Sequence, residues 1–108
     1  MCIFCQIVNH EQSADIVYED KEFIVIKDIN PKAKIHLLIV PKDHIESVNE
    51  LEDSHRDLIA KMILMAKEMA KQSNINKTGY KLVFNVGRGG GQIVDHIHLH
   101  LLGGGERK

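Results

Sequence analysis

The stretch His96-Ile97-His98-Leu99-His100-Leu101-Leu102, followed by Gly103-Gly104-Gly105, stands near the end of this 108-residue chain. Three histidines alternate with aliphatic residues, and a period of two is typical of a β-strand with one buried face. We therefore expect His96, His98 and His100 to line one face of a strand while the aliphatic side chains pack in a core. Because imidazoles are costly to bury without polar partners, this row is a candidate reaction surface.

A single metal ion held by all three histidines is a poor alternative. Residues two apart on a strand are separated by ~6.5–7 Å, so the outer two lie ~13 Å apart, whereas a metal–nitrogen bond is only ~2 Å long. Two adjacent histidines could share a metal, as in an oxygenase or hydrolase that uses His96 and His98. No nearby acidic residue completes that ligand set, because Asp95 is expected on the opposite face. At least one imidazole is left for other chemistry.

Hydrophobic patterning on both sides of this stretch predicts an α+β fold with about five strands in a mostly antiparallel sheet. Apolar spacing predicts a short N-terminal helix over residues 3–8 and one long helix over about 55–73, with Ser54 opening a capping box. The β-prone segments are residues 16–19, 23–27, 35–40, 80–86 and 93–102. The first two of these segments are close enough in sequence to form a hairpin.

Length and charge restrict the class of protein. The length predicts one domain over residues 1–108. The formal net charge of −1, from 14 basic and 15 acidic residues, is unfavourable for a nucleic-acid or anionic-membrane partner. No apolar run approaches the ~20 residues of a membrane span, and the N-terminal residues 1–6 lack the basic and long apolar regions of a signal peptide. We therefore expect a cytoplasmic protein.

A glycine-rich loop leads directly into the histidine row. Gly87-Arg88-Gly89-Gly90-Gly91-Gln92 joins the last two predicted strands. Glycines let backbone N–H groups approach an anion closely, although a hairpin loop uses glycine as well. The position of the loop favours anion binding, because a phosphate held by its amides would lie beside an imidazole nucleophile.

With these motifs the chain closely resembles the histidine-triad (HIT) superfamily, whose motif is His-φ-His-φ-His-φ-φ with φ aliphatic. Residues 96–102 match every position of that motif. Further segments resemble the Hint branch almost from end to end, namely Cys2-Ile3-Phe4-Cys5, Asp28-Ile29-Asn30-Pro31, residues 36–45, Asn85-Val86-Gly87 and Gly91-Gln92. The resemblance implies a HIT fold. Together with the apolar stripe of the long helix, it also implies a homodimer.

The function implied by the resemblance is that of a purine nucleoside phosphoramidase. Such an enzyme cleaves nucleoside 5′-phosphoramidates through a covalent nucleotidyl-histidine and releases the nucleoside monophosphate, with no cofactor required for catalysis. By analogy His98 attacks the α-phosphorus, His100 contacts the phosphate and leaving group, and His96 and His36 orient and polarise the site. A neutral imidazole is a competent nucleophile near pH 7, and neighbouring histidines tend to keep His98 neutral. Two alternatives stay open: dinucleoside polyphosphate hydrolysis, and nucleotide binding by a regulatory module without catalysis.

The resemblance also implies a set of substrate-binding residues. Asp28 matches the acceptor of the ribose hydroxyls, and Asn85 matches a residue near the bond to be cleaved. Gln92 and the backbones of Gly91 and Ile93 match the phosphate site. The apolar slot for the purine matches Ile3, Phe4, Ile7, Ile26 and Ile29. Plain core packing of these five residues is the alternative interpretation.

Two departures from the family pattern concern the leaving group. Ile93 stands where the family often has serine, so one hydroxyl contact is missing, a loss of ~1–3 kcal/mol if nothing replaces it. Many relatives also continue beyond the triad with a segment that helps to shape the substrate site, whereas this sequence ends at residues 105–108. Leaving-group selectivity therefore does not transfer from the resemblance.

Cys2 and Cys5 form a C-x-x-C pair with three interpretations. A thioredoxin-like redox pair normally follows a strand in a βαβ unit, and no such strand precedes this one. Two buried cysteines could simply act as small apolar residues. The third interpretation is a structural zinc site, which needs four ligands; the resemblance to bacterial HIT proteins implies that His44 and His96 would complete it.

Overall fold

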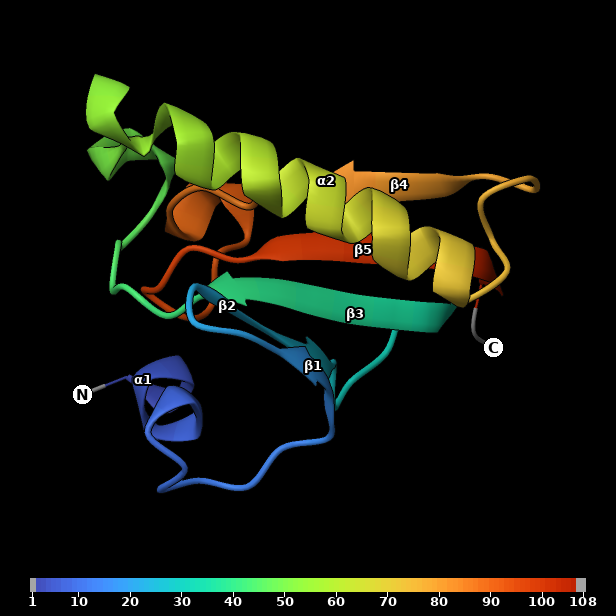
Figure 1. Cartoon of the computed structure of the whole chain (residues 1–108), viewed down its shortest axis with the longest axis horizontal. Helices are drawn as coiled ribbons and strands as arrows, with labels where there is room; N and C mark the ends of the chain where they lie inside the picture. The colour runs from blue at the N-terminus through green and yellow to red at the C-terminus, as the bar shows by residue number, and fades with distance from the viewer. Residues whose placement is uncertain (1, 107–108) are drawn as a thin grey trace.

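The computed structural model describes residues 2–106 and has one five-stranded antiparallel sheet in the order β1-β2-β3-β5-β4 (Figure 1). The strands are β1 Ile16–Glu19, β2 Phe23–Lys27, β3 Ala33–Pro41, β4 Tyr80–Val83 and β5 Leu99–Glu106. The long helix α2, Arg56–Gln72, covers one face, and the short helix α1, Ile3–Val8, lies on the other side (Figure 1). The predicted α+β fold and its helices are confirmed. No helix within residues 2–106 is long and apolar enough to cross a membrane.

Each face of the sheet has its own apolar core. On the α2 side, Leu37 and Ile39 of β3 pack with Leu99 and Leu101 of β5. On the α1 side, the alternate residues of β2 and β3 pack with the helix, and this cluster consists of Phe4, Ile7, Ile24, Ile26, Leu38 and Val40. Because β2 and β3 are covered on both faces, they read in the sequence as nearly continuous apolar runs.

Several predicted strand boundaries were wrong: β3 is longer than the predicted residues 35–40 at both ends, and the last strand continues beyond residue 102 to Glu106. The last strand begins at Leu99 and not at residue 93, so His96 and His98 precede it. The backbone before Leu99 is instead anchored to the loop after β3, where the Ile97 N–H donates to the Ile45 carbonyl at 2.6 Å. The strand β4 also ends three residues earlier than predicted, at Val83.

The predicted capping box at Ser54 was also wrong. A 3-10 turn, η2 Asp53–His55, precedes α2, so that the helix itself starts after His55. The backbone N–H of Glu52 donates to the His55 Nδ1 at 2.9 Å. The polar contact at this helix start therefore involves His55, and Ser54 lies inside the turn. Two further 3-10 turns are η1 Val48–Glu50 and η3 Arg88–Gly90.

Candidate active site and metal centre

The three histidines of the triad have separate environments. His98 and His100 are neighbours, with ring centroids 4.9 Å apart. His96 is fully buried and its Nδ1 faces the two cysteines near the start of α1. The predicted single row of imidazoles is thus divided, because the backbone becomes a regular strand only at Leu99.

The hydrogen bonds of His98 fix which of its nitrogens is free. The Nδ1 atom lies 2.7 Å from the backbone carbonyl of His96. A carbonyl oxygen only accepts, so Nδ1 carries the proton and Nε2 keeps its lone pair. Burial is the main cause that lowers the pKa of His98, with a smaller contribution from the charge of His36. His98 is therefore a neutral imidazole with a nucleophilic Nε2 at pH 7.

A chain of hydrogen bonds sets the opposite tautomer in His100. The Lys32 backbone N–H donates to His36 Nδ1 at 3.1 Å, so His36 carries its own proton on Nε2. That Nε2–H donates to His100 Nδ1 at 2.9 Å, which leaves the proton of His100 on its Nε2. This Nε2 is buried and has no hydrogen-bond partner within residues 2–106. His100 therefore presents an unused N–H donor beside the free Nε2 of His98.

The pKa of His100 is far below the usual value for histidine. Burial is the largest cause, followed by the neighbouring imidazoles of His98 and His36, and together they bring this pKa to about 4. Burial also lowers the pKa of His36, against the opposing charge of Asp28. All three rings are consequently neutral at pH 7, and the predicted effect of neighbouring histidines is secondary to burial.

Asp28, the predicted acceptor of the ribose hydroxyls, lies beside this relay. Its Oδ2 is 3.3 Å from His36 Nε2, while its Oδ1 accepts the Asn30 backbone N–H at 2.8 Å. Asp28, His36 and His100 are close enough together to bind a metal. The tautomer of His36 is unfavourable for a metal at this place. A histidine that binds a metal through one nitrogen normally donates the N–H of its other nitrogen, whereas His36 Nδ1 accepts from the Lys32 N–H.

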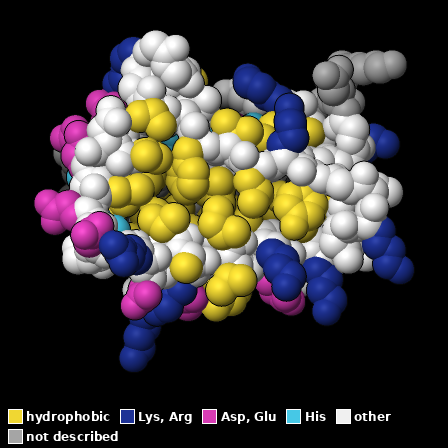
Figure 2. All heavy atoms as spheres, turned by 90° about the horizontal axis from the view of Figure 1, so that it is seen from above, with side chains coloured by type: hydrophobic (Ala, Val, Ile, Leu, Met, Phe, Trp, Pro, Cys, Tyr) yellow, Lys and Arg dark blue, Asp and Glu magenta, His cyan; other side chains and the backbone are white. Residues whose placement is uncertain are grey.

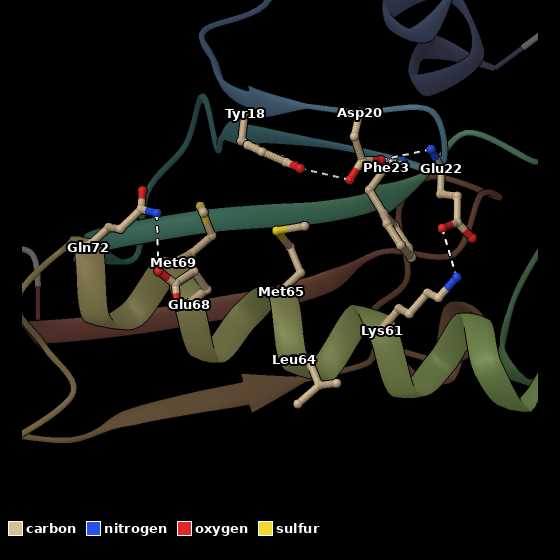
Figure 3. Close-up of a pocket in the computed structure, with 10 residues that line it drawn as sticks. All are labelled: Tyr18, Asp20, Glu22, Phe23, Lys61, Leu64, Met65, Glu68, Met69 and Gln72. Atoms are coloured by element: carbon tan, nitrogen blue, oxygen red, sulfur yellow. Dashed lines mark hydrogen bonds and ion pairs between the residues drawn. The ribbon is translucent and has the colours of Figure 1, made fainter.

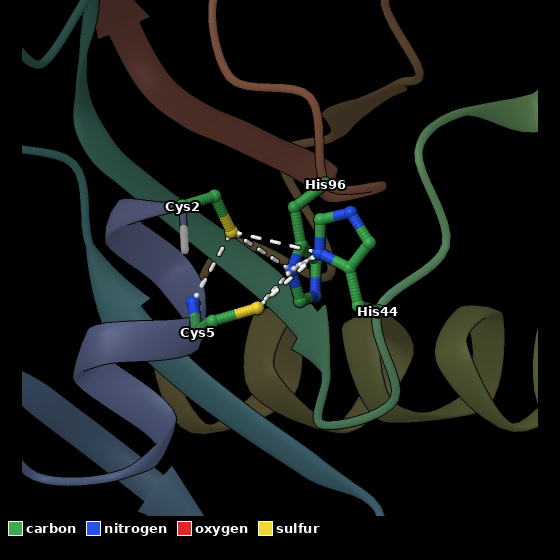
Figure 4. Close-up of side chains that lie close together, drawn as sticks. All are labelled: Cys2, Cys5, His44 and His96. Atoms are coloured by element: carbon green, nitrogen blue, oxygen red, sulfur yellow. Dashed lines mark hydrogen bonds between the residues drawn. The ribbon is translucent and has the colours of Figure 1, made fainter.

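Cys2, Cys5, His44 and His96 converge on one point in a geometry that suits zinc (Figure 4). Cys2 Sγ is 3.3 Å from His96 Nδ1, Cys5 Sγ is 3.2 Å from His44 Nδ1, and the two Nδ1 atoms are 3.2 Å apart. Tetrahedral ligands with bonds of ~2.0–2.3 Å have edges of ~3.3–3.8 Å, close to these values. His96 donates its Nε2–H to the Pro41 carbonyl at 2.8 Å, so its Nδ1 is free to ligate.

The residues assigned to the purine slot divide between core and surface. Phe4, Ile7 and Ile26 are buried in the core beneath α1, whereas Ile3 is 39% exposed and Ile29 is 90% exposed. Phe4 also contacts the triad, with its ring edge-on to His98 at a centroid distance of 4.9 Å and to His96 at 5.8 Å. Of the five residues predicted for the slot, Phe4 is thus packed against the candidate nucleophile, and Ile29 is exposed on the surface.

The glycine loop is held by its own hydrogen bonds. Gln92 is buried, and its side chain accepts from the Gly87 N–H and donates to the carbonyls of Glu46 and Val94. The N–H groups of Gly91 and Gln92 are likewise used inside the loop.

The Ile93 backbone N–H, in contrast, has no acceptor within the described residues. The Asn85 side chain donates to the Gly90 carbonyl at 2.8 Å, and its amide would be 3.5 Å from a Cβ at Gly91. Among the residues of the predicted phosphate site, Ile93 has a backbone N–H that is free to donate. The Gln92 side chain instead holds the shape of the loop.

A groove lies away from these residues, between β1, β2 and α2 (Figure 3). This groove has a volume of about 340 Å³ and an apolar floor that includes Phe23, Met65 and Met69. Lys61 and Glu22 form an ion pair of 2.9 Å across its rim. None of the predicted site residues is among the side chains that line it.

The backbone partners of the site were not visible in the sequence. They are the Lys32 N–H, which sets the tautomer of His36, and the carbonyls of Pro41 and His96, which set those of His96 and His98. Every residue type has these groups, so composition and spacing carry no signal for them. Only the register of the fold identifies them.

Comparisons with known proteins agree with this geometry. The family model described as "Scavenger mRNA decapping enzyme C-term binding" matches residues 1–106. A relative named purine nucleoside phosphoramidase, from Escherichia coli (strain K12), is 43% identical over 102 residues, which are 94% of this chain and 86% of that protein.

Two solved structures share the fold. A HIT family hydrolase from Legionella pneumophila Philadelphia 1 has a TM-score of 0.95 and 47% identity, over 100% of this chain and 95% of that one. A Zn-bound histidine triad family protein from Mycobacterium smegmatis has a TM-score of 0.80 and 29% identity, over 99% and 76%. With the triad, the fold and these relatives in agreement, the chain belongs to the histidine-triad family and is an enzyme of its nucleotide-hydrolase type.

Proposed function

We propose that the protein is a purine nucleoside phosphoramidase that works through a nucleotidyl-His98 intermediate. The single observation that supports this most is the pairing of tautomers: His98 has a free Nε2 lone pair, and His100 next to it has an unused Nε2–H. A nucleophile and a hydrogen-bond donor on adjacent rings are what an in-line displacement at phosphorus requires.

In the first step His98 Nε2 forms a bond to the α-phosphorus, and the bond from phosphorus to the amine nitrogen breaks. The leaving nitrogen takes the bonding electron pair and needs a proton. The Nε2–H of His100 donates a hydrogen bond to that nitrogen and stabilises the developing charge, and the nitrogen takes its proton from solvent water. In the second step the oxygen of a water molecule forms a bond to phosphorus as the bond from phosphorus to His98 Nε2 breaks. His98 keeps the electron pair of that bond, the proton of the water passes to solvent, and nucleoside monophosphate is released.

Binding of the nucleotide uses groups on either side of the triad. The Asp28 carboxylate would accept the ribose hydroxyls, and the exposed Ile3 and Ile29 would cover the purine. The Ile93 N–H, which has no acceptor within the described chain, would donate to a phosphate oxygen, with Asn85 nearby. Because a backbone donor is present at position 93, the missing serine hydroxyl removes one contact and leaves the phosphate site usable.

The cysteine–histidine cluster would hold a structural zinc ion. Bound there, zinc would supply a cross-link between α1, the loop that carries His44 and the start of the triad, and no step of the reaction passes through it. The support is the distance set, the free Nδ1 of His96 and the Zn-bound relative. The antiparallel sheet also lacks the parallel βαβ unit of a thioredoxin-like redox pair.

A homodimer through the α2 side of the molecule is part of the proposal. Figure 2 shows a broad apolar area on this face. Ile63 is 39% exposed, Leu64 on the outside of α2 is 60% exposed, and Leu82 of the edge strand β4 is 37% exposed. A second copy would bury this area. Sedimentation equilibrium tests it: the native chain should be a dimer and Leu64→Lys a monomer, and a monomeric native chain would refute it.

The activity is tested with adenosine 5′-phosphoramidate and diadenosine tetraphosphate as substrates. We expect turnover of the phosphoramidate by the native protein and none by His98→Ala, which should still bind AMP. His10→Asn is the matched control, because His10 is an exposed histidine far from the triad sequence and has a φ of 59°, which asparagine tolerates. Faster turnover of the tetraphosphate would favour polyphosphate hydrolysis, and binding of AMP with no turnover of either substrate would favour a regulatory module.

A further inference from the structure

We propose that Arg88 is a positioning residue that aims the Ile93 backbone N–H at the phosphate of the substrate. The Arg88 guanidinium binds the carbonyl of Gln92, which belongs to the same peptide unit as that N–H. The inference rests on the proposed function, in which the Ile93 N–H donates to a phosphate oxygen. It gives a role to the one charged side chain of the glycine-rich loop, residues 87–92.

The peptide unit between Gln92 and Ile93 has one bonded and one free polar group. Its carbonyl oxygen accepts from Arg88 Nη1 at 2.5 Å, while its N–H has no acceptor within residues 2–106. A trans peptide unit is planar, and its C=O and N–H point in opposite directions. A side chain that fixes the direction of the carbonyl therefore fixes the direction of the N–H as well.

The Asp95 carboxylate holds the guanidinium in place. Arg88 Nη1 lies 2.9 Å from Asp95 Oδ1, and Nη2 lies 3.0 Å from Oδ2, so the ion pair is bidentate. Two such hydrogen bonds restrict the guanidinium more than a single contact does, although both side chains are more than half exposed. Asp95 directly precedes His96, whose ring is bonded to the Pro41 carbonyl. Arg88 therefore fastens the loop to the segment that carries the triad.

The backbone of the loop brings Arg88 close to Gln92. Gly87 and Gly91 have φ values of 69° and 84°, in the left-handed region that glycine adopts readily. The Gln92 N–H donates to the Gly87 carbonyl at 3.0 Å, and the Gly91 N–H donates to the Arg88 carbonyl at 3.0 Å. This closed turn places the Arg88 side chain within reach of both the Gln92 carbonyl and Asp95.

The positive charge of Arg88 has two effects that experiment can separate. A charged donor on the Gln92 carbonyl polarises the peptide unit, so that the Ile93 N–H becomes a stronger donor to the negative phosphate oxygens. The same charge also neutralises the Asp95 carboxylate, which would otherwise repel a phosphate bound at this loop. Aiming of the N–H predicts a defect that remains when the Asp95 charge is removed together with Arg88.

Steady-state kinetics with adenosine 5′-phosphoramidate test this prediction. We expect Arg88→Gln to lower kcat/KM by about 5- to 100-fold, less than deletion of such a donor, because the N–H itself stays. The double variant Arg88→Gln/Asp95→Asn has no unpaired carboxylate and should stay equally low. Arg56→Gln is the matched control, since Arg56 forms an exposed ion pair with Asp53 at the start of α2, and it should keep native kcat/KM.

NMR of the Ile93 backbone amide provides a readout that does not depend on turnover. In the ¹⁵N-labelled native chain saturated with AMP, the Ile93 amide proton should move downfield, because this N–H donates to a phosphate oxygen. In Arg88→Gln saturated with AMP, less than half of this shift should remain, whereas Arg56→Gln should keep all of it. A merely structural role of Arg88 would lower the stability to urea and leave the Ile93 shift of the folded, AMP-bound protein unchanged.

Two results would overturn the role of Arg88. One is a native Ile93 shift in AMP-bound Arg88→Gln, or no shift of this amide in the native chain. The other is recovery of native kcat/KM in the double variant, because the defect would then come from the unpaired Asp95 carboxylate. Failure of the native chain to turn over the phosphoramidate would instead overturn the proposed function, and the Ile93 shift with AMP would still decide whether Arg88 aims this donor.

Discussion

The relay from Lys32 through His36 to His100 is tested by two substitutions that each keep one half of the imidazole. In His36→Asn the side-chain oxygen lies near the position of Nδ1 and can still accept from the Lys32 N–H. In His36→Gln the side-chain amide lies near the position of Nε2 and can still donate to His100 Nδ1. The relay predicts that only the second variant keeps the catalytic tautomer of His100.

The expected size of the effect follows from one hydrogen bond in a buried site. His36 is 5% exposed, and its Nε2–H is the donor that keeps the proton of His100 on Nε2. Without it the proton can move to Nδ1, and a lone pair would then face the phosphate. Loss of such a donor costs about 1–3 kcal/mol, so kcat of His36→Asn should fall by about 5- to 150-fold, while His36→Gln should keep most of it.

Steady-state kinetics with adenosine 5′-phosphoramidate measure kcat and KM, and urea unfolding of each variant reports stability separately. Asparagine is smaller than histidine, so part of its effect on the free energy of unfolding comes from a cavity. The relay would be refuted if the two variants lost kcat equally while both stayed folded, or if His36→Asn kept native kcat.

Three further predictions concern protons and metal. Because burial lowers the pKa of His98 below its usual 6.5, kcat/KM should stay level as the pH falls to that value and decline only below it; a decline centred above 6.5 would contradict this. His100 is neutral in the fold down to about pH 4 but titrates near 6.5 when unfolded, so its contribution to the free energy of unfolding, about 3 kcal/mol, is complete above pH 6.5 and lost between 6.5 and 4; urea unfolding of His100→Asn should show a smaller loss of stability over this range than the native chain, because His36 and His98 still titrate there. Protein purified without chelator should hold about one zinc ion per chain, and His44→Ala should lose it and melt at a lower temperature; a native content below about 0.2 ion per chain would exclude the metal.

Strong local patterns were predictable from the sequence. The hairpin strands β1 and β2 have the predicted bounds, because β-branched runs there are interrupted by a polar turn. The long helix follows its apolar stripe to within a residue at each end. The set Cys2, Cys5, His44 and His96 meets in space as the resemblance implied, although its members are up to 94 positions apart.

Features that depend on tertiary contacts were not predictable. An unbroken strand over residues 93–102 follows from alternation, but the Ile97–Ile45 hydrogen bond holds the first half of that segment outside the ladder. In this segment the Nδ1 of His96 faces Cys2 and Cys5, apart from the ring pair of His98 and His100. The sequence placed Gln92 at the phosphate site but did not indicate that its side-chain amide holds the loop from within, because its partners are backbone groups of Gly87 and Glu46.

The covalent intermediate is the central claim, and a single-turnover experiment tests it most directly. Excess enzyme is mixed with adenosine 5′-phosphoramidate, quenched in alkali to protect the phosphorus–nitrogen bond, digested and examined by tandem mass spectrometry. The proposal predicts one adenylyl group on His98, formed before AMP appears and absent from His98→Asn, whose amide nitrogen can lie near the position of Nδ1 and donate to the His96 carbonyl but which has no group at Nε2. AMP formed at the full single-turnover rate without this adduct, or an adenylyl group on another residue, would contradict it.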